Sequence, residues 1–211
     1  MTRPSLDISD GQHKEGEAMR IRILASAIMA GLLCAAPHAG NANPPSTKAN
    51  AQIASPAQAY DALLSNCEQV MVGVAKAMPA DKYDFTPSSL GIANFKFTGI
   101  RTFAEQVKHV AQQNYVFFSD VGRMQPDVDV DAIAKLKTKD DIVAALEASF
   151  AFAHKAVATL TIENAWEVVP GPQLATRATT AAHGIAHGYN HHGQLVEYER
   201  MNGIDPPQGP Q

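Results

Sequence analysis

Four of the eight histidines fall within ten residues, from His183 to His192, in a segment with a helical pattern. Residues four apart on an α-helix lie above one another on one face, so His187 and His191 can direct two imidazoles at a single cation. His183 lies about 12 Å from His191 along the helix axis, which is too far to share an ion with it. His192 is rotated by about 100° from His191 and points elsewhere. This segment therefore predicts two metal ligands, and a third ligand must come from another element.

The third ligand is best supplied by His109, which lies in a second helical segment that begins near Thr102. On a helical wheel His109 lies about 115° from the centre of the apolar stripe, near the edge of the buried face, where a cleft could keep water. That stripe consists of Phe103, Val107, Val110, Phe117 and Val121. Three neutral imidazoles suit one divalent transition metal ion, Zn or else Ni or Fe, and leave positions open for water or substrate. The predicted chemistry is hydrolysis by an activated water, or transfer to a bound thiol.

The sequence lacks the metalloprotease form of the paired-histidine motif. In His-Glu-x-x-His the Glu beside the first ligand is the general base, whereas here Gly188 follows His187. Acidic residues do lie on the two ligand-bearing segments, namely Glu105, Asp120, Glu197 and Glu199. Of these, Glu105 and Glu197 are better explained as exposed charges, and no spacing favours any of the four as a general acid or base. The sequence therefore identifies no catalytic residue.

Three motifs follow one another along the chain: Arg-Thr-Phe-(x5)-His ending at His109, His-x3-His-x-Gly-Gln over 187–194, and Tyr-Glu-Arg-Met-Asn-Gly-Ile-Asp-Pro-Pro over 198–207. Together with Met-Pro-Ala-Asp-Lys-Tyr-Asp-Phe-Thr-Pro over 78–87, they resemble the DinB/YfiT-like superfamily of small bacterial metalloproteins. The resemblance implies a three-histidine metal site at His109, His187 and His191, the trio that helix geometry also selects. Its thiol-dependent branches include bacillithiol transferases and mycothiol-dependent isomerases. Many members have Tyr or Arg where this chain has His192. His192 is therefore a candidate for an extra ligand or for a proton carrier.

Four long helical patterns position these residues, and almost no strand signal accompanies them. The patterns cover about residues 55–78, 102–121, 139–160 and 176–202, and Gly or Pro residues mark their ends. Between the first two patterns we expect only irregular extended pieces, around residues 83–99. The predicted fold class is all-α, a DinB/YfiT-like four-helix bundle over residues 55–207 with its site on facing helices, followed by a tail at 208–211.

The N-terminal region is expected to lie outside the fold. From Met19 the chain reads Met-Arg-Ile-Arg, an apolar run over 23–36, and small residues at Gly40 and Ala42 before a cleavage point. This pattern predicts an N-terminal extension with a secretory signal peptide over 1–42, with Met19 as the start, and a flexible leader over 43–54. The apolar run is shorter than the roughly 20 residues of a membrane span. A lipoprotein anchored through Cys34 is the disfavoured alternative. We therefore expect a periplasmic or secreted protein.

Composition narrows the classes of function further. The chain has 211 residues, 45% of them hydrophobic, and a formal net charge of −4, which argues against a nucleic-acid partner. Cleavage near Ala42 would leave Cys67 as the single cysteine, and its helical setting favours a buried apolar role over a nucleophilic one. By resemblance a homodimer is expected.

Two classes of function fit the predicted site. One is a metal-dependent hydrolase or transferase acting on a small molecule, and the other is a non-catalytic metal-binding or stress-associated protein. Export weakens the thiol-transferase version, because the usual small thiol pools are cytosolic. An open coordination position beside a substrate-sized pocket would favour the enzyme. A fourth protein ligand, such as His183 or His192, would favour simple binding.

Overall fold

The computed structural model describes residues 55–94, 97–170 and 175–209. The predicted signal peptide, its start at Met19, Cys34 and the leader over 43–54 all lie outside the described residues. The chain divides into two units, residues 1–47 and 48–211, and every described residue belongs to the second. Within this part the elements are four α-helices and three short 3₁₀ helices, with no strand.

The four predicted helices are all present. They are α1 (Pro56–Ala77), α2 (Phe103–Gly122), α3 (Lys139–Val157) and α4 (Arg177–Met201). The largest difference from the prediction is at the end of α3, which stops at Val157 rather than near Leu160. The expectation of extended pieces over 83–99 is wrong in part, because Pro87–Leu90 forms the 3₁₀ helix η2. The 3₁₀ helix η1 (Ala80–Lys82) lies in the same connection, between α1 and α2, and η3 (Val130–Lys135) lies between α2 and α3.

A hydroxyl side chain fixes the start of each long helix. Ser55, Thr102, Thr138 and Thr176 each accept a hydrogen bond from a backbone N–H in the first turn. In α1, α2 and α4 the third helical residue also bonds back to the N-cap backbone, which completes a capping box. These local hydrogen bonds explain why helix starts could be predicted closely from the sequence.

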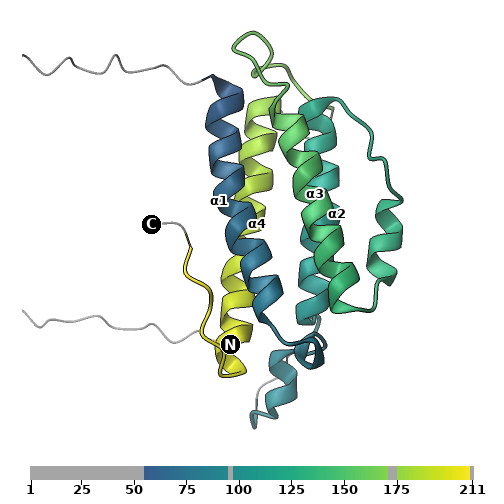
Figure 1. The fold of residues 1–211 in the computed structure, drawn as a ribbon, viewed down its shortest axis with the longest axis vertical. Helices are drawn as coiled ribbons and strands as arrows, with labels where there is room; N and C mark the ends of the chain where they lie inside the picture. Colours follow the sequence, from purple (N-terminus) through teal and green to yellow (C-terminus); the bar gives the residue numbers. More distant parts are fainter. Residues whose placement is uncertain (1–54, 95–96, 171–174, 210–211) are drawn as a thin grey trace, which may run out of the picture. The chain divides into compact units, whose positions relative to one another are not determined.

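The helices form a bundle in which α1 and α4 run in one direction and α2 and α3 in the other (Figure 1). Each of α1 and α2 packs against both α3 and α4. Contacts at the ends agree with this arrangement, since Lys139 at the start of α3 donates to the Met78 carbonyl after α1. Similarly, Arg177 at the start of α4 donates to the Val121 carbonyl near the end of α2. Because α2 and α3 run in parallel, the connection between them must return along the length of the bundle.

Two glycines allow α4 to approach its neighbours closely. A Cβ added at Gly184 would lie 3.0 Å from Phe118 on α2, and one added at Gly188 would lie 2.5 Å from Cys67 Sγ on α1. The spacing of four residues places both glycines on the same side of α4. These contacts set the rotation and the register of α4 against the bundle, and therefore the direction of the histidines beside them.

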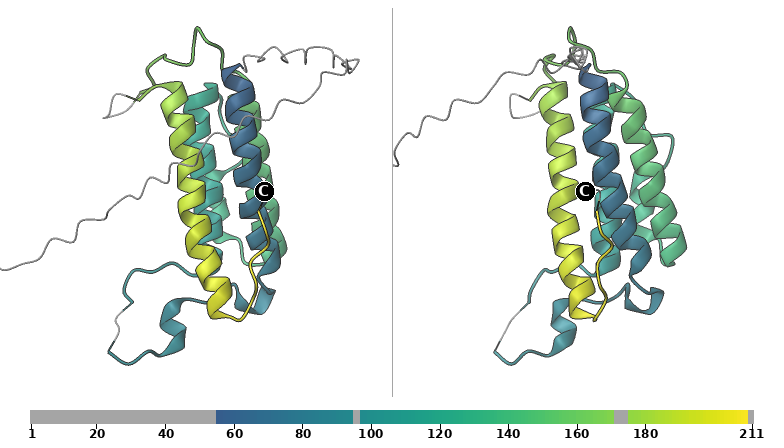
Figure 2. Two further views of the ribbon diagram at one scale, coloured as in Figure 1. Left: turned by 90° about the vertical axis from the view of Figure 1, so that its left-hand side faces the viewer. Right: turned by 60° about the vertical axis from the view of Figure 1, so that its left-hand side comes forward.

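The C-terminal segment turns back after α4. Gly203 adopts a left-handed backbone with φ of 73°, a conformation that favours glycine. The following residues run along α1, as both views in Figure 2 show. Pro207 then lies beside Gly73 and Gly209 beside Val70. Among the described residues, no helix is long and apolar enough to cross a membrane.

Candidate metal centre

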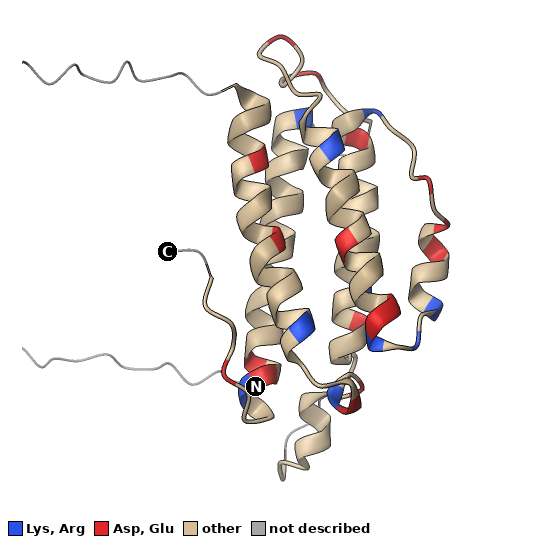
Figure 3. Ribbon diagram, viewed as in Figure 1, with Lys and Arg blue, Asp and Glu red and all other residues tan. Residues whose placement is uncertain are grey.

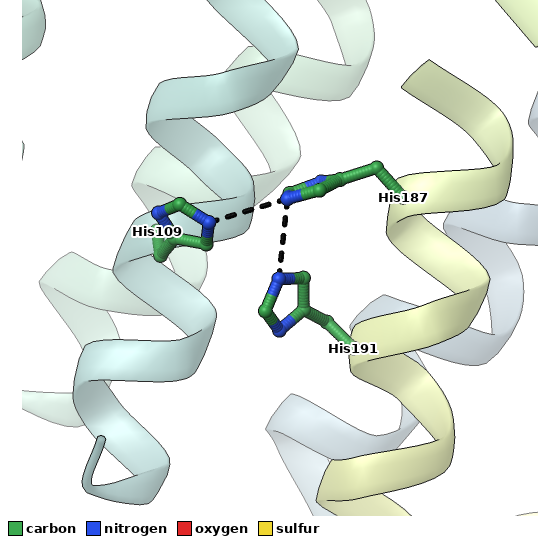
Figure 4. A group of neighbouring side chains, drawn as sticks. All are labelled: His109, His187 and His191. Carbon is green, nitrogen blue, oxygen red and sulfur yellow. Dashed lines mark hydrogen bonds between the residues drawn. The ribbon is translucent and has the colours of Figure 1, made fainter. Parts of the chain in front are cut away.

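His109 on α2 and the pair His187 and His191 on α4 point their rings toward one another between the two helices (Figure 4). The Nε2 atoms of His187 and His109 are 3.2 Å apart, and those of His191 and His187 are 3.1 Å apart. One ligand atom from each histidine lies within 4.8 Å of the other two. The structure thus brings together the three residues that the sequence predicts as ligands.

The spacing of these nitrogens fits a single transition metal ion. Nitrogen atoms bound at about 2.0–2.1 Å to one tetrahedral ion lie about 3.3 Å apart, close to the 3.1 and 3.2 Å found here. The Nε2 atom of a neutral imidazole carries either a proton or a lone pair. At least two of the three Nε2 atoms must therefore both be donors or both be acceptors, and two such atoms cannot form a hydrogen bond with each other. Hydrogen bonds among the three therefore cannot satisfy the cluster, whereas one cation can satisfy three lone pairs.

A buried glutamine orients one of the ligands. Gln106 is 3% exposed, and its Oε1 accepts a hydrogen bond from His191 Nδ1. Its own Nε2 donates to Gln194 Oε1 at 2.8 Å. A proton on Nδ1 leaves the Nε2 lone pair of His191 directed into the cluster, which is the usual role of the hydrogen-bond partner of a ligating histidine. Gln106 therefore makes the contact with the ligand, and Gln194 holds Gln106 in place.

The second histidine of the α4 pair has mainly aromatic neighbours. Phe117 packs edge-on against His187 and against His183, with centroid distances of 5.5 and 5.0 Å. Phe117, predicted on the apolar stripe of this helix, packs partly buried against the core and also forms a wall of the site. The Nδ1 atom of His187 is buried and has no hydrogen-bond partner in the described part of the chain. Aromatic packing therefore holds the Nδ1 side of this ring.

The surroundings keep the three imidazoles in the neutral form that binds metal. Burial, followed by the charges of neighbouring imidazoles and of Arg101, lowers the pKa of His187 and of His191 to about 4 each. Burial, followed by the charge of Arg101, also lowers the pKa of His109. Near neutral pH the cluster is therefore free of protons that a metal ion would have to displace.

No fourth ligand from the described residues completes the cluster, which consists of three histidines. His183 is exposed and packs on Phe117. His192 is half-buried, and burial lowers its pKa. Neither side chain closes the site, so a bound ion would keep positions open.

A cleft of about 500 Å³ adjoins the cluster, and His109 is the one of the three histidines that lines it. Its polar wall includes Arg101, Glu105, Lys108 and Gln112. This volume lies within the range of small-molecule pockets. A substrate-sized space therefore reaches the edge of the candidate metal centre.

The acidic residues of the two helices differ strongly in their surroundings. Glu105 is exposed, and its Oε2 accepts from Thr102 N in the capping box. Glu197 is exposed and pairs with Arg200 at 2.6 Å, and Asp120 is exposed as well. Glu199, in contrast, is fully buried, and neither of its oxygens has a hydrogen-bond partner among the described residues. Nothing in the spacing of the acidic residues predicted this burial.

Gly188 could not be replaced by the glutamate of the protease motif. Its Cα faces the Cys67 side chain so closely that any Cβ would collide with the sulfur. Cys67 itself is 1% exposed, and burial raises its pKa to about 12, which confirms the prediction of a buried apolar role over a nucleophilic one.

Away from the cluster, His154 on α3 joins two acidic residues of α1. Its ring nitrogens lie 2.6 Å from Asp61 Oδ1 and 3.1 Å from Glu68 Oε2. His154 therefore links α3 to α1 and takes no part in the three-histidine cluster.

In a comparison with known protein families, the family model described as the DinB superfamily matches residues 63–195. The matched range contains His109, His187 and His191. Among curated proteins, no sequence matches this chain.

Proposed function

Because this chain belongs to the DinB superfamily, we propose that His109, His187 and His191 bind one divalent transition metal ion, Zn or else Ni or Fe. We further propose that the site catalyses hydrolysis or group transfer on a small molecule. The observation that carries the proposal is the convergence of three Nε2 atoms beside a cleft, with no fourth ligand among the described residues.

The chain's own residues prepare the site for this role. Gln106 directs the Nε2 lone pair of His191 into the cluster, and burial keeps the imidazoles neutral. A divalent ion held there would act as a Lewis acid and would lower the pKa of a coordinated water or thiol. The cleft at His109 gives a small substrate access to the open side.

The setting of the protein belongs to the same proposal. The signal-peptide pattern of residues 1–42 supports export to the periplasm or to the medium. Export favours hydrolysis over thiol transfer, since small thiols are scarce outside the cytosol. We propose a small-molecule substrate, no nucleic-acid partner and a homodimer as the assembled form.

Elemental analysis of the untagged, mature protein tests the metal site. We expect about one equivalent of a transition metal in the wild type and loss of the metal in the His187→Ala/His191→Ala double variant. His183→Ala is the matched control, because His183 lies one turn before His187 on the same helix but is exposed. It should retain the metal.

The metal-loaded protein would then be screened against small esters, amides and lactones, and with thiol acceptors. Turnover that disappears with the double variant supports the enzyme. Metal bound without turnover supports the alternative, a non-catalytic metal-binding or stress-associated protein. Failure of the wild type to take up Zn, Ni or Fe would contradict the proposal as a whole.

A further inference from the structure

Arg101 differs from the other arginines in the described part of the chain, because its guanidinium has no ion pair or side-chain hydrogen bond there. Arg123 and Arg177 both pair with Glu167, and Arg200 pairs with Glu197. In the view of Figure 3, basic and acidic residues are interspersed along the helices rather than gathered into one basic face. The unpaired charge of Arg101 is therefore a local feature of the cleft that it lines.

The backbone of Arg101 is well anchored. Its carbonyl accepts a hydrogen bond from Tyr198 Oη at 3.1 Å, which ties the segment before α2 to α4. The next residue, Thr102, is the N-cap of α2 and takes part in a capping box with Glu105. The guanidinium thus extends from a fixed point beside both helices that carry the histidines.

Arg101 lines the same cleft as His109, so its charge lies beside the candidate metal centre. A guanidinium there repels a metal ion bound at the cluster. Arg101 is exposed, so its charge is open to a ligand, and an anion that enters the cleft would reduce this repulsion.

The remaining polar groups of the cleft define the charge of that ligand. Lys108 Nζ already donates to the carbonyls of Ala134 and Leu136, and Gln112 donates to that of Val130. Glu105 adds a negative charge, with one of its oxygens used in the helix cap. The side chains of the cleft therefore carry two cations against one carboxylate, and a bound metal ion would add further positive charge, so the cleft favours an anionic ligand.

We propose that the substrate of this site is a small carboxylic acid whose carboxylate binds the Arg101 guanidinium while its reacting group lies at His109, His187 and His191. This inference rests on the proposed function and specifies its substrate class. A guanidinium presents paired N–H donors that match the two oxygens of a carboxylate, so it can fix the orientation of the substrate as well as hold it.

Two thiols that differ in one group provide the probes, namely 3-mercaptopropionate and its neutral amide, 3-mercaptopropionamide. Both offer a thiol to the metal, and only the first offers a carboxylate to Arg101. Affinities would be measured by titration calorimetry on the full-length, zinc-loaded protein, after the metal content of each variant has been determined. We expect the wild type to bind the carboxylate probe about tenfold more tightly than the amide.

Three variants distinguish a specific effect of Arg101 on the binding preference from a general effect of the protein's charge. Arg101→Gln should lose the preference for the carboxylate while binding the amide as the wild type does, and Arg101→Lys should recover part of the preference. Arg200→Gln removes the same charge from an arginine that is already paired with Glu197, and it should leave the preference intact. Thermal unfolding of each variant would verify that the fold is retained.

The outcomes distinguish the two proposals. A preference that is absent in the wild type, or unchanged in Arg101→Gln, would overturn this inference while the bound metal still supports the proposed function. A wild type that binds no metal would overturn both.

Discussion

Replacement of Glu199 by glutamine is predicted to stabilise the protein in a pH-dependent way. Glu199 lies in α4, is 0% exposed and has no hydrogen-bond partner for either carboxylate oxygen among the described residues. Burial raises its pKa from the usual 4.5 to about 7. The folded state therefore favours the protonated carboxyl, because the charged form has lost its hydration without gaining a partner.

The size of the effect follows from the pKa difference. A rise from 4.5 to about 7 corresponds to roughly 3 kcal/mol of free energy of unfolding. Because the folded pKa is the higher one, the unfolded chain releases the proton first as the pH rises. The contribution of Glu199 to the free energy of unfolding is thus fully present below pH 4.5 and is lost as the pH increases toward 7. Glutamine is neutral and nearly the same shape, so Glu199→Gln should remove this loss.

Urea unfolding of the metal-free protein at pH 5, 6, 7 and 8, followed by circular dichroism, measures the prediction. The gain of Glu199→Gln over the wild type should be small at pH 5 and grow to about 3 kcal/mol at pH 8. Glu197→Gln is the matched control, since Glu197 is exposed and pairs with Arg200, and it should show little change. A Glu199→Gln gain that does not vary with pH, or a loss at pH 8, would refute the reasoning and show that the ionised carboxylate is stabilised in the fold.

Three further predictions concern the site and its support. Gln106→Leu should weaken metal binding by roughly 10- to 100-fold in competition with a chelator, because it removes the partner of a ligand; unchanged affinity would exclude the orienting role. Gly188→Ala should lower the melting temperature, because the added Cβ would lie 2.5 Å from Cys67 Sγ. Gly193→Ala is the control, since its added Cβ would have nothing within 4 Å, and it should raise the free energy of unfolding by about 1 kcal/mol. Equal effects of the two alanines would contradict the close packing. Cys67 should resist alkylation in the folded protein and react after unfolding, as peptide mapping can verify, and rapid native labelling would disagree with its burial.

Local features allowed much of the fold to be predicted. Helix starts follow from Ser and Thr caps whose hydrogen bonds span three residues. The pairing of His187 with His191 follows from helix geometry alone, because a four-residue separation places both on one face. The 3₁₀ helix over Pro87–Leu90 was not foreseen, although its capping box at Thr86 and its proline in the first turn are local signals.

The candidate site could be predicted only in part. His109 was identified because it lies near the edge of an apolar stripe, which is a property of the sequence. Gln106 lies in the same helix, but nothing in its spacing indicated that its amide would bond His191. The absence of a partner for Arg101 among the described residues likewise depends on which side chains the fold brings near it.

The sequence by itself therefore determined where the helices lie and which residues share a helix face. The reason is that backbone hydrogen bonds, caps and side-chain periodicity act over only a few residues. The tertiary structure alone decided that α2 and α4 bring three Nε2 atoms together and that a cleft opens beside His109. It also decided that Glu199 is buried with no hydrogen-bond partner among the residues that the structure describes. These depend on the rotation and register of packed helices, which close contacts such as that of Gly188 with Cys67 fix between residues far apart in the chain.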